Sequence, residues 1–273
     1  MKPFLFMHGV TLSFGGLSVI DNLDLQIVKG SRCGLIGPNG AGKTTIFNLL
    51  SGVYHPTAGE ILLNDSAIDA IPLDRRIEIG IGRTFQNLRL MKHLTVLENI
   101  MLGQHHLVGA WTKICAPMSS RWNRRWREEA ISAAETLGLG EDIYRLAQGL
   151  PYGVQKRVEV ARALVSKPSL LLLDEPAAGL NSAEREELLS VLKTSLGSDT
   201  TVLIVEHDTD FVRTLCDHAV ALNFGRKIAE GDPSSVCSNQ AVIEAYLGKD
   251  EPTHRGHAIS VGDANKERSD HAA

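Results

Sequence analysis

Residues 37–45 read Gly37-Pro38-Asn39-Gly40-Ala41-Gly42-Lys43-Thr44-Thr45, and this stretch decides the expected fold. An apolar run over 32–36 precedes it and a helix-like run over 45–50 follows it, which is the context of a phosphate-binding loop. Glycines let the backbone turn its N–H groups toward phosphate oxygens, and a helix start adds a favourable dipole. We therefore expect a nucleoside triphosphate to bind here, with Lys43 at the β and γ phosphates and the Thr44 hydroxyl on Mg²⁺. The alternative is a chance glycine-rich turn.

Composition excludes several other classes of protein. The chain has 273 residues and a formal net charge of −4, so no global positive field attracts it to nucleic acid or anionic lipid. Its four cysteines lie far apart, which argues against a disulfide framework or zinc site and makes a reducing cytosol the default. No stretch approaches the ~20 apolar residues of a membrane span, and residues 1–7 do not resemble a signal peptide. If the protein works at a membrane, other chains must span it.

The order of apolar patterns predicts an α/β fold. Two short strands joined at 14–16 are expected within 5–28, and another at 59–63. From residue 153 helices and strands alternate, with helices over 153–165, 183–196 and 209–215 and strands over 169–173, 201–205 and 219–223. This alternation is typical of βαβ units around a largely parallel sheet, beside an antiparallel β subdomain. We expect one nucleotide-binding domain over 1–249, with a helical subdomain inserted at about 87–165, and a disordered polar tail over 250–273.

A second motif supplies two carboxylates at the end of a buried strand. Residues 170–176 read Leu-Leu-Leu-Leu-Asp-Glu-Pro. On a chain with a phosphate loop, Asp174 is expected to hold the Mg²⁺ shell, and Glu175 to act as the general base on the attacking water. The alternative is that Asp-Glu-Pro only caps and turns the strand.

Four further motifs complete an ordered series, at 83–87 (Arg-Thr-Phe-Gln-Asn), 150–164, 178–181 (Ala-Gly-Leu-Asn) and 205–208 (Val-Glu-His-Asp). The series resembles the ATP-binding subunit of an ABC transporter from about residue 5 to residue 248. The runs at 82–87, 94–99, 175–181 and 242–248 are similar to the branched-chain amino-acid importer ATPases of the LivG type. The resemblance implies an ATP-driven importer of a small amino acid or amide, peripheral on the cytoplasmic face of the inner membrane. Its implied partners are a second ATPase, two transmembrane permeases and an extracytoplasmic binding protein, with no nucleic acid.

The resemblance also assigns roles to individual residues. Phe14 takes the place of the aromatic ring that stacks on adenine, although a core position is the structural alternative. Gln86 matches the glutamine that touches Mg²⁺ or the attacking water and senses the membrane partner. His207 matches the histidine that contacts the γ-phosphate. The ATP-binding set is then Phe14, Gly37, Asn39, Gly40, Ala41, Gly42, Lys43, Thr44 and Thr45, the catalytic set is Glu175, His207, Gln86 and Lys43, and the metal set is Thr44, Gln86 and Asp174.

The chain departs from the family pattern at its signature. The family has Leu-Ser-Gly-Gly-Gln, whose serine and amides bind the γ-phosphate held by the opposite subunit, whereas residues 150–154 read Leu-Pro-Tyr-Gly-Val. Pro151 has neither hydroxyl nor N–H, and losing one preorganised donor costs about 3 kcal/mol. Tyr152, Gly153 and Val154 would still face the partner's ATP. We expect an asymmetric heterodimer in which Glu175 hydrolyses ATP against the partner's signature, while this chain's own signature serves a weaker site.

Other functions stay open at this stage. A soluble ABC ATPase acting on DNA or ribosomes usually carries two cassettes or a long coiled-coil insertion, and this chain has one cassette. A GTPase or kinase would need an Asn-Lys-x-Asp run, and 265–268 lacks the aspartate. An exporter ATPase shares the same energy chemistry. The basic, Trp-containing run at 121–127 is interpreted as helix packing under a solvated face, with a surface near the permease or lipid headgroups as the alternative.

Overall fold

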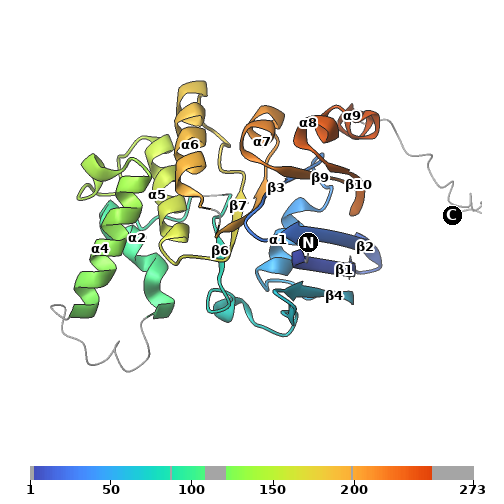
Figure 1. The fold of residues 1–273 in the computed structure, drawn as a ribbon, viewed down its shortest axis with the longest axis horizontal. Helices are drawn as coiled ribbons and strands as arrows, with labels where there is room; N and C mark the ends of the chain where they lie inside the picture. The colour runs from blue at the N-terminus through green and yellow to red at the C-terminus, as the bar shows by residue number, and fades with distance from the viewer. Residues whose placement is uncertain (1–2, 87, 108–120, 198, 248–273) are drawn as a thin grey trace, which may run out of the picture.

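Two β-sheets organise the protein in this computed structural model, which describes residues 3–86, 88–107, 121–197 and 199–247 (Figure 1). The first sheet is antiparallel, in the order β2-β1-β4-β5. The second has the order β10-β9-β3-β8-β7-β6, and only its edge strand β10 runs antiparallel to its neighbour. The expected α/β class, with a largely parallel sheet and an antiparallel subdomain, is therefore confirmed.

The strands have the following bounds. The antiparallel sheet contains β1 (Pro3–Phe14), β2 (Leu17–Val28), β4 (Ala58–Leu63) and β5 (Ser66–Ala67). The larger sheet contains β3 (Arg32–Ile36), β6 (Ile81–Arg83), β7 (Leu170–Asp174), β8 (Thr201–Val205), β9 (His218–Asn223) and β10 (Arg226–Gly231). The α-helices are α1 (Lys43–Leu50), α2 (Val96–Met101), α4 (Arg121–Thr136), α5 (Tyr152–Leu164), α6 (Ser182–Ser195), α7 (Thr209–Leu215), α8 (Pro233–Cys237) and α9 (Gln240–Leu247). Short 3₁₀ turns are η1 (Leu73–Arg75), η2 (Leu102–Leu107) and η3 (Gly140–Asp142).

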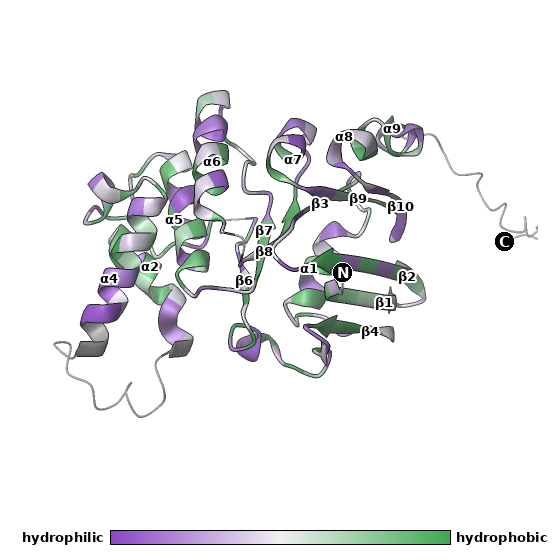
Figure 2. Ribbon diagram, in the orientation of Figure 1, coloured by the Kyte–Doolittle hydropathy of each residue, from purple (hydrophilic) through white to green (hydrophobic). Residues whose placement is uncertain are grey.

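The larger sheet is covered on both faces, and β7 shows why. Successive side chains of a strand point to opposite faces. Leu170 and Leu172 pack in one core with α1 and the antiparallel sheet, whereas Leu171 and Leu173 pack in a second core with the helices of the other face. The central strands β7 and β8 are therefore largely apolar, and both carry green in Figure 2, which is typical of a parallel sheet buried on both sides.

The helices α2, α4 and α5 gather at the end of the molecule farthest from β1 and β2 (Figure 1). Two helices begin with a capping box, in which the residue before the helix and the third helical residue each accept the other's backbone N–H through their side chains. Thr95 and Glu98 form this box at α2, and Asn181 and Glu184 form it at α6. The helical segment lies where the sequence predicts an insertion, although the domain bounds 1–249 and 87–165 stay predictions.

The lengths of the first two strands differ from the sequence expectation. The first two strands are not short, because each runs for 12 residues, and shifts in their register let so long a ribbon twist. In α4, Arg124, Arg125 and Arg127 are exposed and Trp126 is half-buried, whereas Trp111, the side chain of Trp122 and the tail 250–273 lie outside the described residues. Among the described helices, none is long and apolar enough to cross a membrane.

Candidate nucleotide site

The phosphate loop lies at the carboxyl end of β3, where the chain turns into α1. Parallel strands bring their carboxyl ends to one edge, so the ends of β7 and β8 lie on this side as well. Glu175 follows β7 and His207 lies just beyond β8. A cavity of about 240 Å³ opens here, and its lining consists of Val19, residues 39–45, Gln86, Glu175 and His207. The structure thus brings the predicted loop and three predicted catalytic side chains together.

Two glycines of the loop have backbone reasons to be glycine. Gly42 is the N-cap of α1 at φ 105°, a conformation that side chains disfavour. A Cβ on Gly37 would lie 2.3 Å from the carbonyl oxygen of Leu222. These residues let the loop close tightly enough to surround the Lys43 ammonium, which donates to the carbonyls of Gly37 at 2.6 Å and Pro38 at 3.0 Å. Burial lowers the pKa of Lys43, while the nearby Glu175 and Asp174 carboxylates oppose that effect.

The Glu175 carboxylate is held between two predicted partners. Gln86 Nε2 donates to Glu175 Oε2 at 3.0 Å, and His207 Nε2 lies 2.8 Å from Glu175 Oε1. An ionised carboxylate can only accept, so His207 carries its proton on Nε2 in this contact. Glu175 itself has φ 48°, a left-handed conformation that costs free energy in a non-glycine residue and is frequent at active sites. With its side chain 13% exposed, Glu175 is oriented and still open to water.

Asp174 lies deeper than Glu175, at the last position of β7, with 4% of its surface exposed. Burial raises its pKa, and the Arg83 guanidinium, with Nη2 at 3.0 Å from Asp174 Oδ2, opposes that shift. Hydroxyl, amide and carboxylate oxygens are the hard donors that Mg²⁺ prefers, and Thr44, Gln86 and Asp174 supply all three. No group of three or more His, Cys, Asp or Glu suited to a metal occurs among the described residues. Thr44 and Gln86 line the cavity at the phosphate loop, so the donors suit an ion held jointly with phosphates.

Sequence reasoning missed four residues that position the site. Buried Lys156 of α5 donates to the carbonyls of Gln86 at 3.3 Å and Glu175 at 3.4 Å. Buried Glu206 accepts the backbone N–H of Ala177 at 2.7 Å and of His207 at 3.1 Å. The other two, Arg83 and Tyr246, are described below. All four fall inside runs quoted from the sequence, at 83–87, 150–164, 205–208 and 242–248, but none stands at a spacing that signals chemistry.

Gly37, Asp174, Phe14 and the signature residues 152–154 are not part of the cavity lining. Phe14 is 47% exposed, which contradicts the alternative of a core position, and its ring meets Tyr54 edge-on at 5.2 Å. Its stacking on adenine stays a prediction. Tyr152, Gly153 and Val154 form the first turn of α5, with Pro151 as an N-cap that makes no side-chain hydrogen bond. Their contact with a partner's nucleotide also stays a prediction.

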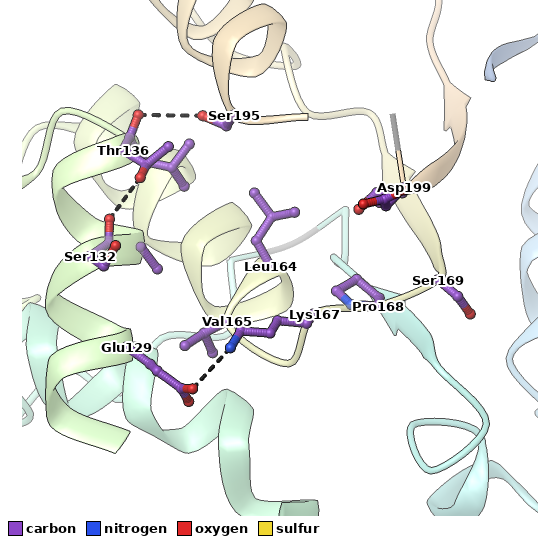
Figure 3. A pocket seen from close by; sticks show the side chains of 13 residues that line it. Glu129, Ser132, Thr136, Leu164, Val165, Lys167, Pro168, Ser169, Ser195 and Asp199 are labelled. Atoms are coloured by element: carbon purple, nitrogen blue, oxygen red, sulfur yellow. Dashed lines mark hydrogen bonds and ion pairs between the residues drawn. The ribbon is translucent and has the colours of Figure 1, made fainter. Parts of the chain in front are cut away.

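A different cavity, of about 520 Å³, lies between α4, the end of α5 and the end of α6 (Figure 3). Lys167 and Glu129 form an ion pair across it at 2.9 Å. Ser169 and Thr200 of its lining precede β7 and β8. The cavity is thus at the amino ends of the strands, opposite the phosphate loop, and takes no part in the nucleotide site.

The fold and site together define a P-loop nucleotide-binding ATPase. Residues 20–178 match the ABC transporter family, and residues 226–252 match the branched-chain amino acid ATP-binding cassette transporter family. The chain belongs to the ABC transporter family.

Curated relatives of similar length include LivG of Escherichia coli K12 and BraF of Pseudomonas aeruginosa, both high-affinity branched-chain amino acid transport ATP-binding proteins. Each is 40% identical over 91% of this chain and 99% of its own length. Among solved structures, the ADP conformation of MJ1267, an ATP-binding cassette of an ABC transporter, matches with a TM-score of 0.77 and 29% identity over 91% of this chain and all of its own. A nucleotide-free cassette from an ABC transporter matches with a TM-score of 0.78 and 28% identity, over 91% of this chain and all of its own.

Proposed function

We propose that this chain is the ATP-hydrolysing subunit of an importer for branched-chain amino acids or a related small amino acid or amide. The observation that carries the substrate class is the match at 226–252 to the branched-chain amino acid cassette family, together with the similarity to LivG and BraF over nearly their whole length. A cassette core by itself is shared by proteins with many substrates. The class of substrate is therefore inferred from the full-length similarity, and the reaction from the site.

The proposed reaction uses Glu175 as its base. A water oxygen attacks the γ-phosphorus, Glu175 accepts a proton from that water, and ADP leaves with the broken bond's electrons. Gln86 and His207, which hold the two carboxylate oxygens at 3.0 and 2.8 Å, keep Glu175 facing the cavity. Bound Mg²⁺, with Thr44, Gln86 and Asp174 as ligands directly or through water, would neutralise charge on the phosphates.

The proposed assembly has two ATPase subunits head to tail, two permeases and an extracytoplasmic binding protein, on the cytoplasmic face of the inner membrane. A groove of about 410 Å³ beside the Gln86 loop supports a permease contact. Its lining includes Phe85 and Arg89 from that loop and the exposed side chains of Val53 and Leu73. A short amphipathic permease helix with an acidic residue opposite Arg89 would suit this surface. Movement of the helix would then reach Gln86, and through it Glu175.

Isolation of the tagged chain from native membranes in mild detergent tests this proposal. We expect two hydrophobic permeases and a second ATPase to be recovered with it, and Leu73→Asp in the groove to reduce permease recovery. A matched change at exposed Leu247, on α9, serves as the control. Recovery of soluble partners, ribosomes or DNA alone would contradict the membrane assignment but not the ATP site.

A further inference from the structure

Two buried arginines hold the carboxyl-terminal end of α1, the helix that starts at the phosphate loop. Arg76 donates from Nε to the Ile71 carbonyl at 2.9 Å and from Nη1 to the Leu50 carbonyl at 3.2 Å. Arg83, at the end of β6, donates from Nη1 to Asn48 Oδ1 at 2.9 Å and Ser51 Oγ at 2.6 Å. Cations at a helix carboxyl end satisfy its unpaired carbonyls and complement its dipole. Both arginines thus anchor this helix end, Arg76 through the Leu50 carbonyl and Arg83 mainly through side chains, with a longer contact of 3.4 Å to the Phe47 carbonyl.

Arg83 does something that Arg76 does not, because its other terminal nitrogen reaches into the nucleotide site. Nη2 donates to Asp174 Oδ2 at 3.0 Å, across 91 residues of sequence. The side chains are 11% and 4% exposed, so the pair is shielded from solvent and its geometry is fixed. The guanidinium also lies over the rings of Phe47, at 5.7 Å, and Phe85, at 5.3 Å. One planar group therefore joins α1, the strand end that bears Asp174, and the residue before Gln86.

We propose that Arg83 is a positioning residue that fixes the Asp174 carboxylate against the phosphate-loop helix and so sets the Mg²⁺-dependent part of ATP binding. The inference rests on the proposed function, in which Asp174 serves the metal shell. The pair uses Oδ2, so Oδ1 would be the oxygen that Asp174 offers to the metal shell. Outer partners that orient a metal-binding carboxylate typically change metal affinity by roughly 10- to 100-fold when they are replaced.

Substitution by lysine separates the two tasks of Arg83. Lysine keeps the charge but has a single nitrogen. It therefore cannot bond Ser51 at the end of α1 and Asp174 at the same time, as the two terminal nitrogens of Arg83 do. Arg76→Lys is the matched control, because it alters a buried arginine at the same helix end without a contact to Asp174. Should Arg83→Lys fail to fold, Ser51→Ala is the milder variant, since it removes the 2.6 Å anchor on α1 and leaves both members of the ion pair.

The experiment measures the affinity of the full chain for a fluorescent ATP analogue, in EDTA and in Mg²⁺, for each folded variant. In the wild type we expect Mg²⁺ to tighten binding, and in Arg83→Lys we expect that gain to fall by roughly 10- to 100-fold while the affinity in EDTA is unchanged. Ser51→Ala should lose part of this Mg²⁺-dependent increase in affinity, and Arg76→Lys should keep all of it. In an Asp174→Asn background, Arg83→Lys should cause no further loss, because Arg83 acts through Asp174.

Three results would overturn the inference. The first is an increase in affinity on adding Mg²⁺ that is as large in Arg83→Lys as in the wild type. The second is an equal loss of affinity in EDTA and in Mg²⁺, and the third is a loss in the Asp174→Asn background as large as the loss that Arg83→Lys causes alone. The second of these would make Arg83 a purely structural residue. If Mg²⁺ does not tighten ATP binding in the wild type itself, the metal role of Asp174 fails and the part assigned to Arg83 fails with it, whereas the three results above overturn the part of Arg83 alone.

Discussion

The Tyr246 hydroxyl accepts a hydrogen bond from the backbone N–H of Gly37 at 2.9 Å, which joins the last helix of the described chain to the first residue of the phosphate loop. Gly37 is buried, whereas Tyr246 is 39% exposed, so a partly open side chain supplies the acceptor for a buried N–H. Burial raises the pKa of Tyr246, while the bond from Gly37 opposes that effect. The segment that matches the branched-chain cassette family therefore reaches the nucleotide site through one hydroxyl.

Tyr246→Phe should lower the stability of the protein and its affinity for ATP. The change leaves the Gly37 N–H buried without an acceptor, which costs about 1–3 kcal/mol in the free energy of unfolding. We expect a fall of this size in the free energy of unfolding measured by urea titration, and a several-fold weaker affinity for ATP. Tyr144→Phe, on an exposed tyrosine of the helical subdomain, is the control. Equal behaviour of the two variants would mean that the Tyr246 contact contributes nothing.

Lys43→Ala should weaken nucleotide binding itself. The ammonium sits among the loop carbonyls, where it is placed for a polyphosphate. A charge-assisted hydrogen bond contributes about 1.5–3 kcal/mol, so we expect ATP to bind roughly 10- to 100-fold more weakly. Calorimetric titration checks this, with exposed Lys92→Ala as the control. An unchanged affinity would rule Lys43 out of the binding site.

Pro151→Ser tests the asymmetric dimer. Pro151 is the N-cap of α5 with φ −52° and ψ 149°, a conformation that serine can adopt. A serine there can cap the helix, which stabilises by about 1 kcal/mol, and restores the hydroxyl of the family signature. We expect a small rise in melting temperature and only a modest change in the ATP turnover of the intact complex. A large rise in turnover would contradict the asymmetry.

Glu206→Gln should change how stability depends on pH. Burial raises the Glu206 pKa above its ordinary 4.5. Below pH 4.5 the carboxyl is protonated in both folded and unfolded chains; as pH rises through the folded pKa, ionisation favours the unfolded chain. The free energy of unfolding of the wild type should therefore fall relative to the variant as pH rises above 4.5. Chemical denaturation at several pH values measures the difference, which should stay flat for exposed Glu186→Gln.

The local parts of the site are predictable because each is a continuous run of sequence. Strand, loop and helix around Lys43 stand next to one another, as do the apolar strand and Asp174-Glu175. The alternation of apolar runs likewise predicts the strands at 170–174 and 201–205 nearly to the residue. Edge strands escape that reasoning. The short β6 is buried at two of its three positions but is too brief to show a period, and β10 pairs on one side only and is largely polar.

The supporting contacts could not be predicted, since they depend on how distant segments meet. Arg83 and Asp174 are 91 residues apart, and Gly37 and Tyr246 are 209 apart. Lys156 lies one turn into α5, and only the packing of that helix against the sheet brings its ammonium to the carbonyl of Glu175. A lone Arg, Lys or Tyr in a sequence is most often a surface or packing residue, and its spacing carries no sign of the contact.

The central claim is that Glu175 hydrolyses ATP to drive import of a branched-chain amino acid. The most direct measurement is uptake of labelled leucine, isoleucine and valine into vesicles containing the complete complex, with its ATPase side open to added ATP, for the wild type and Glu175→Gln. The account predicts ATP-dependent uptake by the wild type, and a roughly 10²–10⁴-fold loss of ATP turnover with retained ATP binding in the variant, the usual scale of general-base catalysis. Uptake that persists in Glu175→Gln, or wild-type vesicles that hydrolyse ATP but take up none of the three amino acids, would contradict it.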